Sequence, residues 1–119
     1  MALTRVRISE VIDSGYAVSA TDGKLVYDRI ATEILKGNRV ELSFENTTRL
    51  TTAFLNAAVG QLYGEFTPTQ IRGALVAPTG AEAWHLNRLK AVTDRAKTFF
   101  NDPDRLDRII SEVTNDGSL

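Results

Sequence analysis

The spacing of apolar and polar residues predicts short strands that alternate with helices. Apolar residues alternate with polar ones over residues 5–12, and a short apolar run follows at residues 16–20. A turn of Asp, Ser and Gly separates these two segments, so we expect them to form a β-hairpin. Alternation over residues 39–44 and the apolar run at residues 74–77 predict two further strands.

Apolar residues spaced three and four positions apart predict the helices between and after these strands. Thr21 or Asp22 is expected to cap the first helix, and Gly37 is expected to end it. The predicted helices cover residues 21–36, 52–63, 81–100 and 103–114, with a single helical turn at Thr67-Pro68 and a tail at residues 115–119.

This order of elements predicts an α/β fold. Strands that alternate with helices form mostly parallel sheets with right-handed crossovers. We therefore expect a mostly parallel sheet of about four strands, with the N-terminal β-hairpin as an antiparallel edge and the helices packed against the sheet. The chain has 119 residues, a length typical of one domain, so residues 1–119 are expected to form a single domain.

Composition and charge exclude several classes of protein. The formal net charge is −1, which gives no bulk field toward nucleic acid or an anionic membrane. The chain has no cysteine and one histidine, which excludes a disulfide scaffold, a cysteine nucleophile and a histidine-built zinc site within one chain. No targeting segment and no apolar run of the ~18–20 residues needed for a membrane span are found. We therefore expect a soluble, cytoplasmic protein without a metal site.

The sequence contains no recognisable set of catalytic residues. Its carboxylate pairs fall in turns or on polar strand faces, without a nucleophile or a histidine at fixed spacing. Its glycines form neither the GxGxxG nor the GxxxxGK[ST] phosphate-binding loop. We therefore expect a protein that is not an enzyme and that carries no cofactor.

A strand, a loop and the following helix in the middle of the chain carry a run of characteristic residues: Val40, Leu42 and Phe44, then Ala53, Phe54 and Leu55, then Leu62, Tyr63 and Gly64. This pattern resembles a bacterial family of STAS-like domains of unknown function, related to the STAS domains of anti-anti-sigma factors. The resemblance extends over most of residues 4–100. It implies a small STAS-like α/β domain that acts as a regulatory or interaction module, with an ATP-binding switch kinase as its partner and no catalytic residues.

The same resemblance points to the start of the helix after residue 50. Anti-anti-sigma factors carry an Asp-Ser-Ser-Gly signature there, and their partner kinase phosphorylates a serine in it. The resemblance places Thr51 at the acidic position, Thr52 at the phosphoacceptor and Phe54 at the glycine. The acid and the glycine are thus missing, and two interpretations stay open: a helix cap at Thr51 or Thr52, or a phosphoacceptor.

Three further residues are candidate contacts for a partner. Arg49 and Asn56 belong to the polar segment 45–56, which follows a predicted strand, and ligands of open α/β sheets bind at the carboxyl ends of strands. Trp84 belongs to a residue type enriched at binding hot spots, with a partly buried packing role as the alternative. His85 is interpreted as a packed residue on the apolar face of its helix.

The sequence thus predicts a non-enzymatic regulatory module that binds a protein such as a switch kinase or an ATPase. The alternative is a small nucleotide- or anion-binding protein that uses the same helix N-terminus. Association into homo-oligomers stays open. We expect no nucleic acid and no membrane as partner, because charges of both signs alternate along the two last predicted helices, as on a solvated face. These charges are Arg88, Lys90, Asp94, Arg95, Lys97, Asp102, Asp104, Arg105, Asp107 and Arg108.

Overall fold

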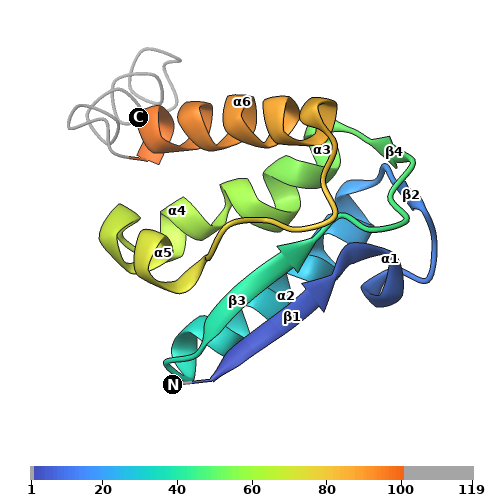
Figure 1. Ribbon diagram of the computed structural model, residues 1–119. Coiled ribbons are helices and arrows are strands. Elements are labelled where there is room, and N and C mark those ends of the chain that lie inside the picture. Colours follow the sequence, from blue (N-terminus) through green and yellow to red (C-terminus); the bar gives the residue numbers. More distant parts are fainter. Residues whose placement is uncertain (1, 101–119) are drawn as a thin grey trace, which may run out of the picture.

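The strands of the protein pair in parallel (Figure 1). In the computed structural model, which describes residues 2–100, β1 (Leu3–Arg7) lies beside β3 (Arg39–Ser43), and β2 (Tyr16–Ala17) lies beside β4 (Arg49–Leu50). Each pair forms a separate two-stranded sheet. The mixture of helices with short parallel strands agrees with the predicted α/β class, whereas the expected sheet of about four strands is not formed by the described residues.

The segment predicted as the last strand lies beside β3 but does not form a regular strand. It makes two isolated parallel bridges to β3, Val40 with Leu75 and Ser43 with Thr79. The stretch from Leu75 to Thr79 is one residue longer than the stretch of β3 that it faces. Pro78 also lacks a backbone N–H, so the ladder cannot continue through it. This extra residue and the proline explain why the third strand stays incomplete.

The predicted N-terminal β-hairpin is wrong. After β1 the chain forms one helical turn, α1 (Ile8–Val11), and the turn at Asp13 (φ +53°) leads into β2, which pairs with β4 instead of β1. Ile8, Val11 and Ile12 explain the difference, because all three pack in or against the core. Spacings of three and four residues place them on one side of a helical turn, whereas a strand would point Val11 and Ile12 to opposite faces.

The first long helix, α2 (Ala20–Leu35), begins earlier than predicted and ends where predicted. Its cap is Ser19, whose Oγ accepts a hydrogen bond from the Asp22 backbone N–H (3.1 Å), so the predicted cap at Thr21 or Asp22 is wrong. Asp22 instead lies in the first turn, where the helix dipole favours a negative charge. At the other end, Gly37 takes a φ of +79° and its N–H donates to the Ile34 carbonyl (3.0 Å), as expected of a C-terminal glycine.

The helix predicted over residues 52–63 is divided into three parts: α3 (Thr52–Leu55), the π-helical turn η1 (Asn56–Gly60) and α4 (Leu62–Glu65). Within it, the Gln61 backbone N–H donates to the Asn56 carbonyl (3.0 Å), a bond that spans five residues. A Cβ atom at residue 60 would lie 2.7 Å from Asn56 Oδ1, so the glycine there leaves room for the asparagine side chain.

The last two described helices are α5 (Pro68–Ala74) and α6 (Ala83–Phe100). α5 is longer than the predicted single turn, because Thr67 and Gln70 form a capping box with reciprocal hydrogen bonds of 3.1 and 2.8 Å. The predicted helix 103–114 and the tail 115–119 lie outside the described residues. No helix among residues 2–100 combines the length and the apolar character needed to cross a bilayer.

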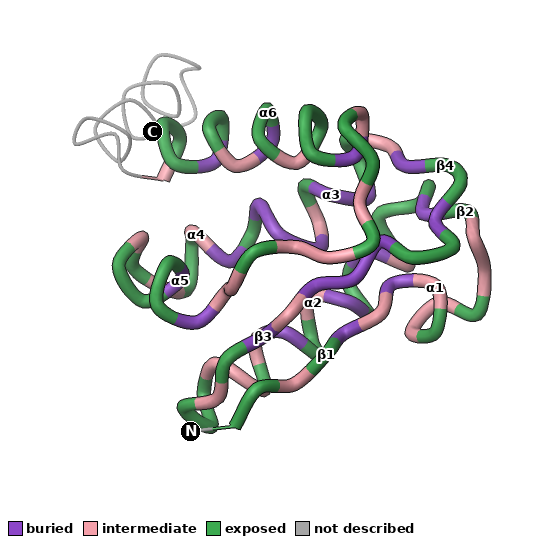
Figure 2. Tube along the Cα trace, in the orientation of Figure 1, coloured by how far each residue is buried: buried purple, intermediate pink, exposed green. Residues whose placement is uncertain are grey.

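The helices are stacked in layers around one buried core (Figure 1). α2 packs against β1 and β3, and α3 with η1 lies between α2 and α6. Buried positions of α6, such as Val92 and Ala96, are on the side toward η1, whereas its outer side is exposed (Figure 2). This arrangement places the start of α3 beside the start of α6, at one end of the molecule.

Gly23 sets the distance between α2 and α3, and we expect Gly23→Ala to destabilise the fold by at least about 1 kcal/mol. An added Cβ would lie 2.5 Å from the Phe54 carbonyl oxygen and 2.9 Å from the Ala57 Cβ. Because the carbonyl is backbone, the two helices would have to move apart, which outweighs the roughly 1 kcal/mol gained in helix propensity. Urea denaturation measures the change.

Gly73→Ala is the matched control, because no atom lies within 4 Å of an added Cβ at this second helical glycine. Stability there should stay the same or rise slightly. Equal stability of the Gly23 variant and the wild type would mean that the two helices are less closely packed than described.

Candidate functional site

The two threonines at the start of α3 lie in different environments. Thr51 is the N-cap: its Oγ1 accepts a hydrogen bond from the Phe54 backbone N–H (3.1 Å) and donates one to the Val18 carbonyl (2.6 Å). Its hydroxyl is therefore fully engaged in joining α3 to the end of β2. Thr52, at the first helical position, is exposed to solvent. Of the two hydroxyls, that of Thr52 is the accessible one.

A surface cavity of about 360 Å³ lies beside this cap. Three of the five candidate residues from the sequence line it, namely Arg49, Thr51 and Trp84. The remaining lining residues are Val18, Thr48, Leu50 and Arg88. The structure thus brings residues from β4 and from the start of α6 to the same place.

Two guanidinium groups face this cavity, and each is held by neighbouring groups. Arg88 Nη1 donates to the Leu50 carbonyl (2.6 Å), and its guanidinium lies 5.6 Å from the centroid of the Trp84 ring. The Arg49 guanidinium lies 5.5 Å from the centroid of the Tyr16 ring. No carboxylate of residues 2–100 lies within 4.0 Å of either group. The cavity therefore carries local positive charge.

Asn56 does not line this cavity but a second one farther along α6, of about 430 Å³. Arg95 lines the second cavity together with Gln61 and Ala96. Arg88 and Arg95 are seven residues apart, so they project from the same side of α6, two turns from one another. The two cavities share no lining residue, and we use the name basic groove for the surface along α6 that holds both of them with Arg49, Arg88 and Arg95.

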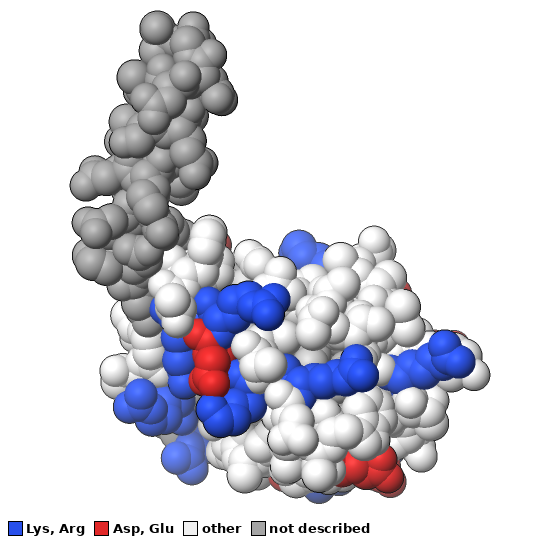
Figure 3. Space-filling model, turned by 90° about the horizontal axis from the view of Figure 1, so that it is seen from above, with Lys and Arg blue, Asp and Glu red and all other residues white. Residues whose placement is uncertain are grey.

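Arg88 and Arg95 are the residues that sequence reasoning missed. The alternating charges on α6 indicated a solvated face, and this holds for Lys90, whose Nζ donates to Asp94 Oδ2 (2.7 Å). That hydrogen bond lowers the pKa of the Asp94 carboxyl. Neither arginine has such a partner among residues 2–100. Their seven-residue spacing was the available signal. Figure 3 shows Lys and Arg gathered on the described part of this face, with one acidic patch between them.

The wall between the groove and the interior consists of Trp84 and His85. The ring centroids of Trp84 and His85 are 3.9 Å apart, and the His85 ring also stacks on Phe44. His85 is 2% exposed; its Nδ1 accepts from the Glu82 backbone N–H (2.9 Å), and its Nε2 donates to the Thr47 carbonyl (2.8 Å). The predicted packing role of His85 is confirmed, and Trp84 is half-buried against it.

The described residues supply little for redox, metal or nucleophilic chemistry. No group of three or more His, Cys, Asp or Glu side chains that could hold a metal ion occurs in residues 2–100. The exposed hydroxyl of Thr52 belongs to a helix start, and both ring nitrogens of His85 are already bonded inside the protein. The surface beside the start of α3 combines two guanidinium groups with an indole ring, residue types that are enriched at binding hot spots.

A short-stranded parallel α/β domain with a basic surface along α6 is thus the class that this fold and site define. Residues 22–77 match the model of a family described as a STAS-like domain of unknown function (DUF4325). The match confirms the resemblance seen in the sequence over this segment, which includes β3, β4 and the Thr51 cap. No curated protein and no solved structure matches the chain.

Proposed function

We propose that this protein is a non-enzymatic regulatory module that binds a partner protein, such as a switch kinase or an ATPase, through segment 45–56 and the groove beside it. One observation carries the proposal: Arg49 and Thr51 line one cavity with Trp84, which is distant from both in the sequence, and this cavity lies next to the exposed Thr52. The match to a STAS-like domain supports a regulatory or interaction role.

The composition of the cavity supports protein binding. Tryptophan and arginine are the residue types most enriched at binding hot spots, and here Arg88 lies over the ring of Trp84. Trp84 is half-buried and supported from behind by His85, so it presents a rigid surface to a partner. A rigid anchor loses little conformational entropy on binding.

The pair of guanidinium groups favours a second candidate function, binding of a small anion or nucleotide. Arg49 and Arg88 line one cavity without a carboxylate partner among residues 2–100. Trp84 is the single tryptophan of the chain, so its fluorescence reports on this cavity directly. A saturable change on titration with inorganic phosphate or ATP alone would favour this second function.

Thr52→Glu is expected to weaken binding of the native partner at least about tenfold. The fold should survive, because Thr52 is exposed and the N-terminus of a helix tolerates a negative charge. The new carboxylate would stand where a phosphate on Thr52 would stand. Calorimetry with the partner purified from the native host gives the affinity, and circular dichroism verifies folding.

Two further variants sharpen this test. Thr69→Glu introduces the same charge at an exposed position in the first turn of α5, away from the groove, and should leave affinity unchanged. Thr52→Ala removes the hydroxyl without adding charge and should bind like the wild type. If Thr52→Glu binds as tightly as Thr69→Glu, the contact surface is not at the start of α3.

A further inference from the structure

We propose that the basic groove receives an acidic segment of the partner protein, whose carboxylates pair with Arg49, Arg88 and Arg95. This inference rests on the proposed function and names the chemistry of the partner. The groove would bind a short extended stretch with Glu or Asp at regular intervals. Recognition would be by charge and hydrogen bonds, with Trp84 as the flat wall beside the segment.

The guanidinium groups of the first cavity are positioned to accept carboxylates. A guanidinium has five N–H donors, and Arg88 uses Nη1 for the Leu50 carbonyl. The Arg88 guanidinium also lies over the ring of Trp84, and that of Arg49 lies over the ring of Tyr16. The free N–H edges of planar guanidinium groups bind carboxylates in a bidentate manner. Arg88 is therefore held at the cavity by its bond to the Leu50 carbonyl, with further N–H groups left to bind a ligand.

The spacing of the arginines sets the spacing of the acids that they would bind. Seven residues of α-helix separate Arg88 from Arg95, a rise of about 10 Å along the helix axis. A peptide in the polyproline II conformation advances about 3.1 Å per residue with three residues per turn, so residues three apart lie on the same side and about 9 Å from one another. An acidic residue at every third position would therefore meet both arginines.

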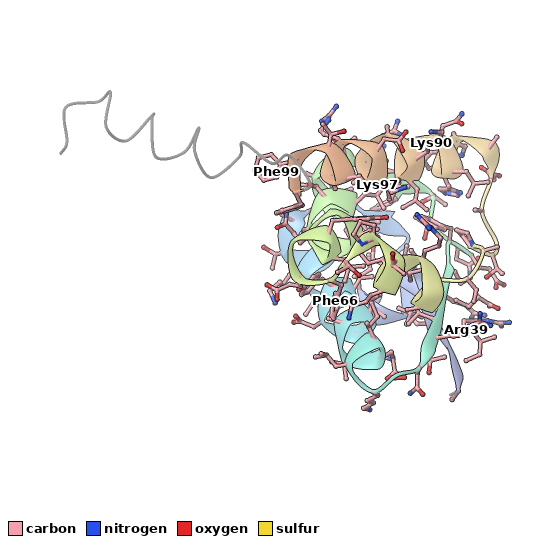
Figure 4. The ribbon with its side chains drawn as sticks, turned by 90° about the vertical axis from the view of Figure 1, so that its left-hand side faces the viewer. Arg39, Phe66, Lys90, Lys97 and Phe99 are labelled. Carbon is pink, nitrogen blue, oxygen red and sulfur yellow. The ribbon has the colours of Figure 1, made fainter. Side chains whose placement is uncertain are left out.

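The groove differs in pairing from most other charged parts of the described surface. The following basic residues are ion-paired within the protein: Arg5, Arg7, Lys24, Lys36 and Lys90. In contrast, the two cavities of the groove are lined by three arginines and no Asp or Glu. Arg29, Arg39, Arg72 and Lys97 are also without an ion pair among residues 2–100. Of these, Arg39 lies at the end of the molecule away from α6, which carries Lys90 and Lys97 (Figure 4).

A protein segment fits this groove better than nucleic acid does. The chain as a whole has a net charge of −1, and Asp94 lies on α6 beside the basic residues. A duplex or single strand presents a phosphate at every nucleotide and needs an extended basic surface. Three arginines in a groove between two helices and a strand suit a few carboxylates.

The test uses the full chain and two short synthetic peptides, one with Glu at every third position and one with Gln instead. Trp84 fluorescence follows binding. The Glu peptide should bind saturably, lose affinity as salt is added, and bind at least about tenfold more weakly to Arg49→Glu and Arg88→Glu. Arg39→Glu is the matched control and should bind like the wild type. Arg88→Glu loses the bond to the Leu50 carbonyl, so this variant could fail to fold. In that case Arg49→Glu alone tests the inference.

Several results would overturn the inference. Equal binding of the Gln peptide, equal weakening by Arg39→Glu, or saturation by inorganic phosphate alone would each do so, as would tighter binding of a poly-dT oligonucleotide than of the Glu peptide. If Thr52→Glu weakens binding of the native partner but Arg49→Glu and Arg88→Glu do not, the inference is wrong while the proposed function stands. If the arginine variants weaken binding of the Glu peptide but no variant weakens binding of the native partner, the proposed function is wrong while the groove still binds acidic peptides.

Discussion

Phe54→Ala is expected to reduce the free energy of unfolding by about 3–5 kcal/mol, the usual cost of removing a fully buried phenylalanine. Phe54 is 0% exposed and is among the largest fully buried side chains of the described structure. It lies in the third position of α3, where that helix meets the Gly23 region of α2. The neighbouring helices are fixed by β3 and by the core, so they can close the resulting cavity only in part.

A urea or guanidinium denaturation series measures this loss. Leu35→Ala is the control, because Leu35 is 78% exposed at the end of α2 and its truncation should change stability by less than about 0.5 kcal/mol. If both variants unfold at the wild-type midpoint, Phe54 does not hold α3 against the core.

Phe54 also explains a departure from the anti-anti-sigma signature. The resemblance places a glycine at this position, yet here the side chain fills the core, and its backbone N–H completes the Thr51 cap. The position is therefore committed to packing, and the part of the helix start that faces solvent is Thr52. Thr52 is thus the exposed hydroxyl among the residues of α3.

Elements with a single dominant periodicity could be predicted from the sequence. Val40, Leu42 and Phe44 alternate, and all three are buried along β3 and just after it. Gly37 marked the end of α2 because a positive φ favours glycine. In residues 8–12 the alternating and helical patterns overlap, and the packing of Ile8, Val11 and Ile12 in or against the core after the end of β1 decides for the helical turn.

The candidate site was predicted in its parts but not in its arrangement. Arg49, Thr51 and Trp84 were chosen on local grounds and do line one cavity. That Arg88 would join them depends on α6 packing beside β4, which places its guanidinium at the Leu50 carbonyl. No local pattern encodes a contact between residues 38 positions apart. Mixed charges along a helix look the same in the sequence whether their partners lie on that helix or elsewhere.

The second large effect is expected at His85, where His85→Ala should reduce stability by about 3 kcal/mol. The imidazole links two segments: Nδ1 accepts from the Glu82 N–H ahead of α6, and Nε2 donates to the Thr47 carbonyl after β3. Alanine leaves the Thr47 carbonyl, in a residue only 5% exposed, without its donor. It also removes the support of the Trp84 ring, so the tryptophan emission should shift toward that of a solvated indole.

His85→Gln and His85→Asn separate the two hydrogen bonds, because the glutamine amide nitrogen reaches the position of Nε2 and the asparagine oxygen that of Nδ1. Glutamine should retain more stability. It keeps the bond to the buried Thr47 carbonyl, whereas the exposed Glu82 can give its N–H to water. Leu86→Ala, at the next residue and 43% exposed, is the control and should cost less than about 0.5 kcal/mol. Asparagine as stable as glutamine would show that the link to Thr47 does not hold the wall of the groove, and that Trp84 depends on α6 alone.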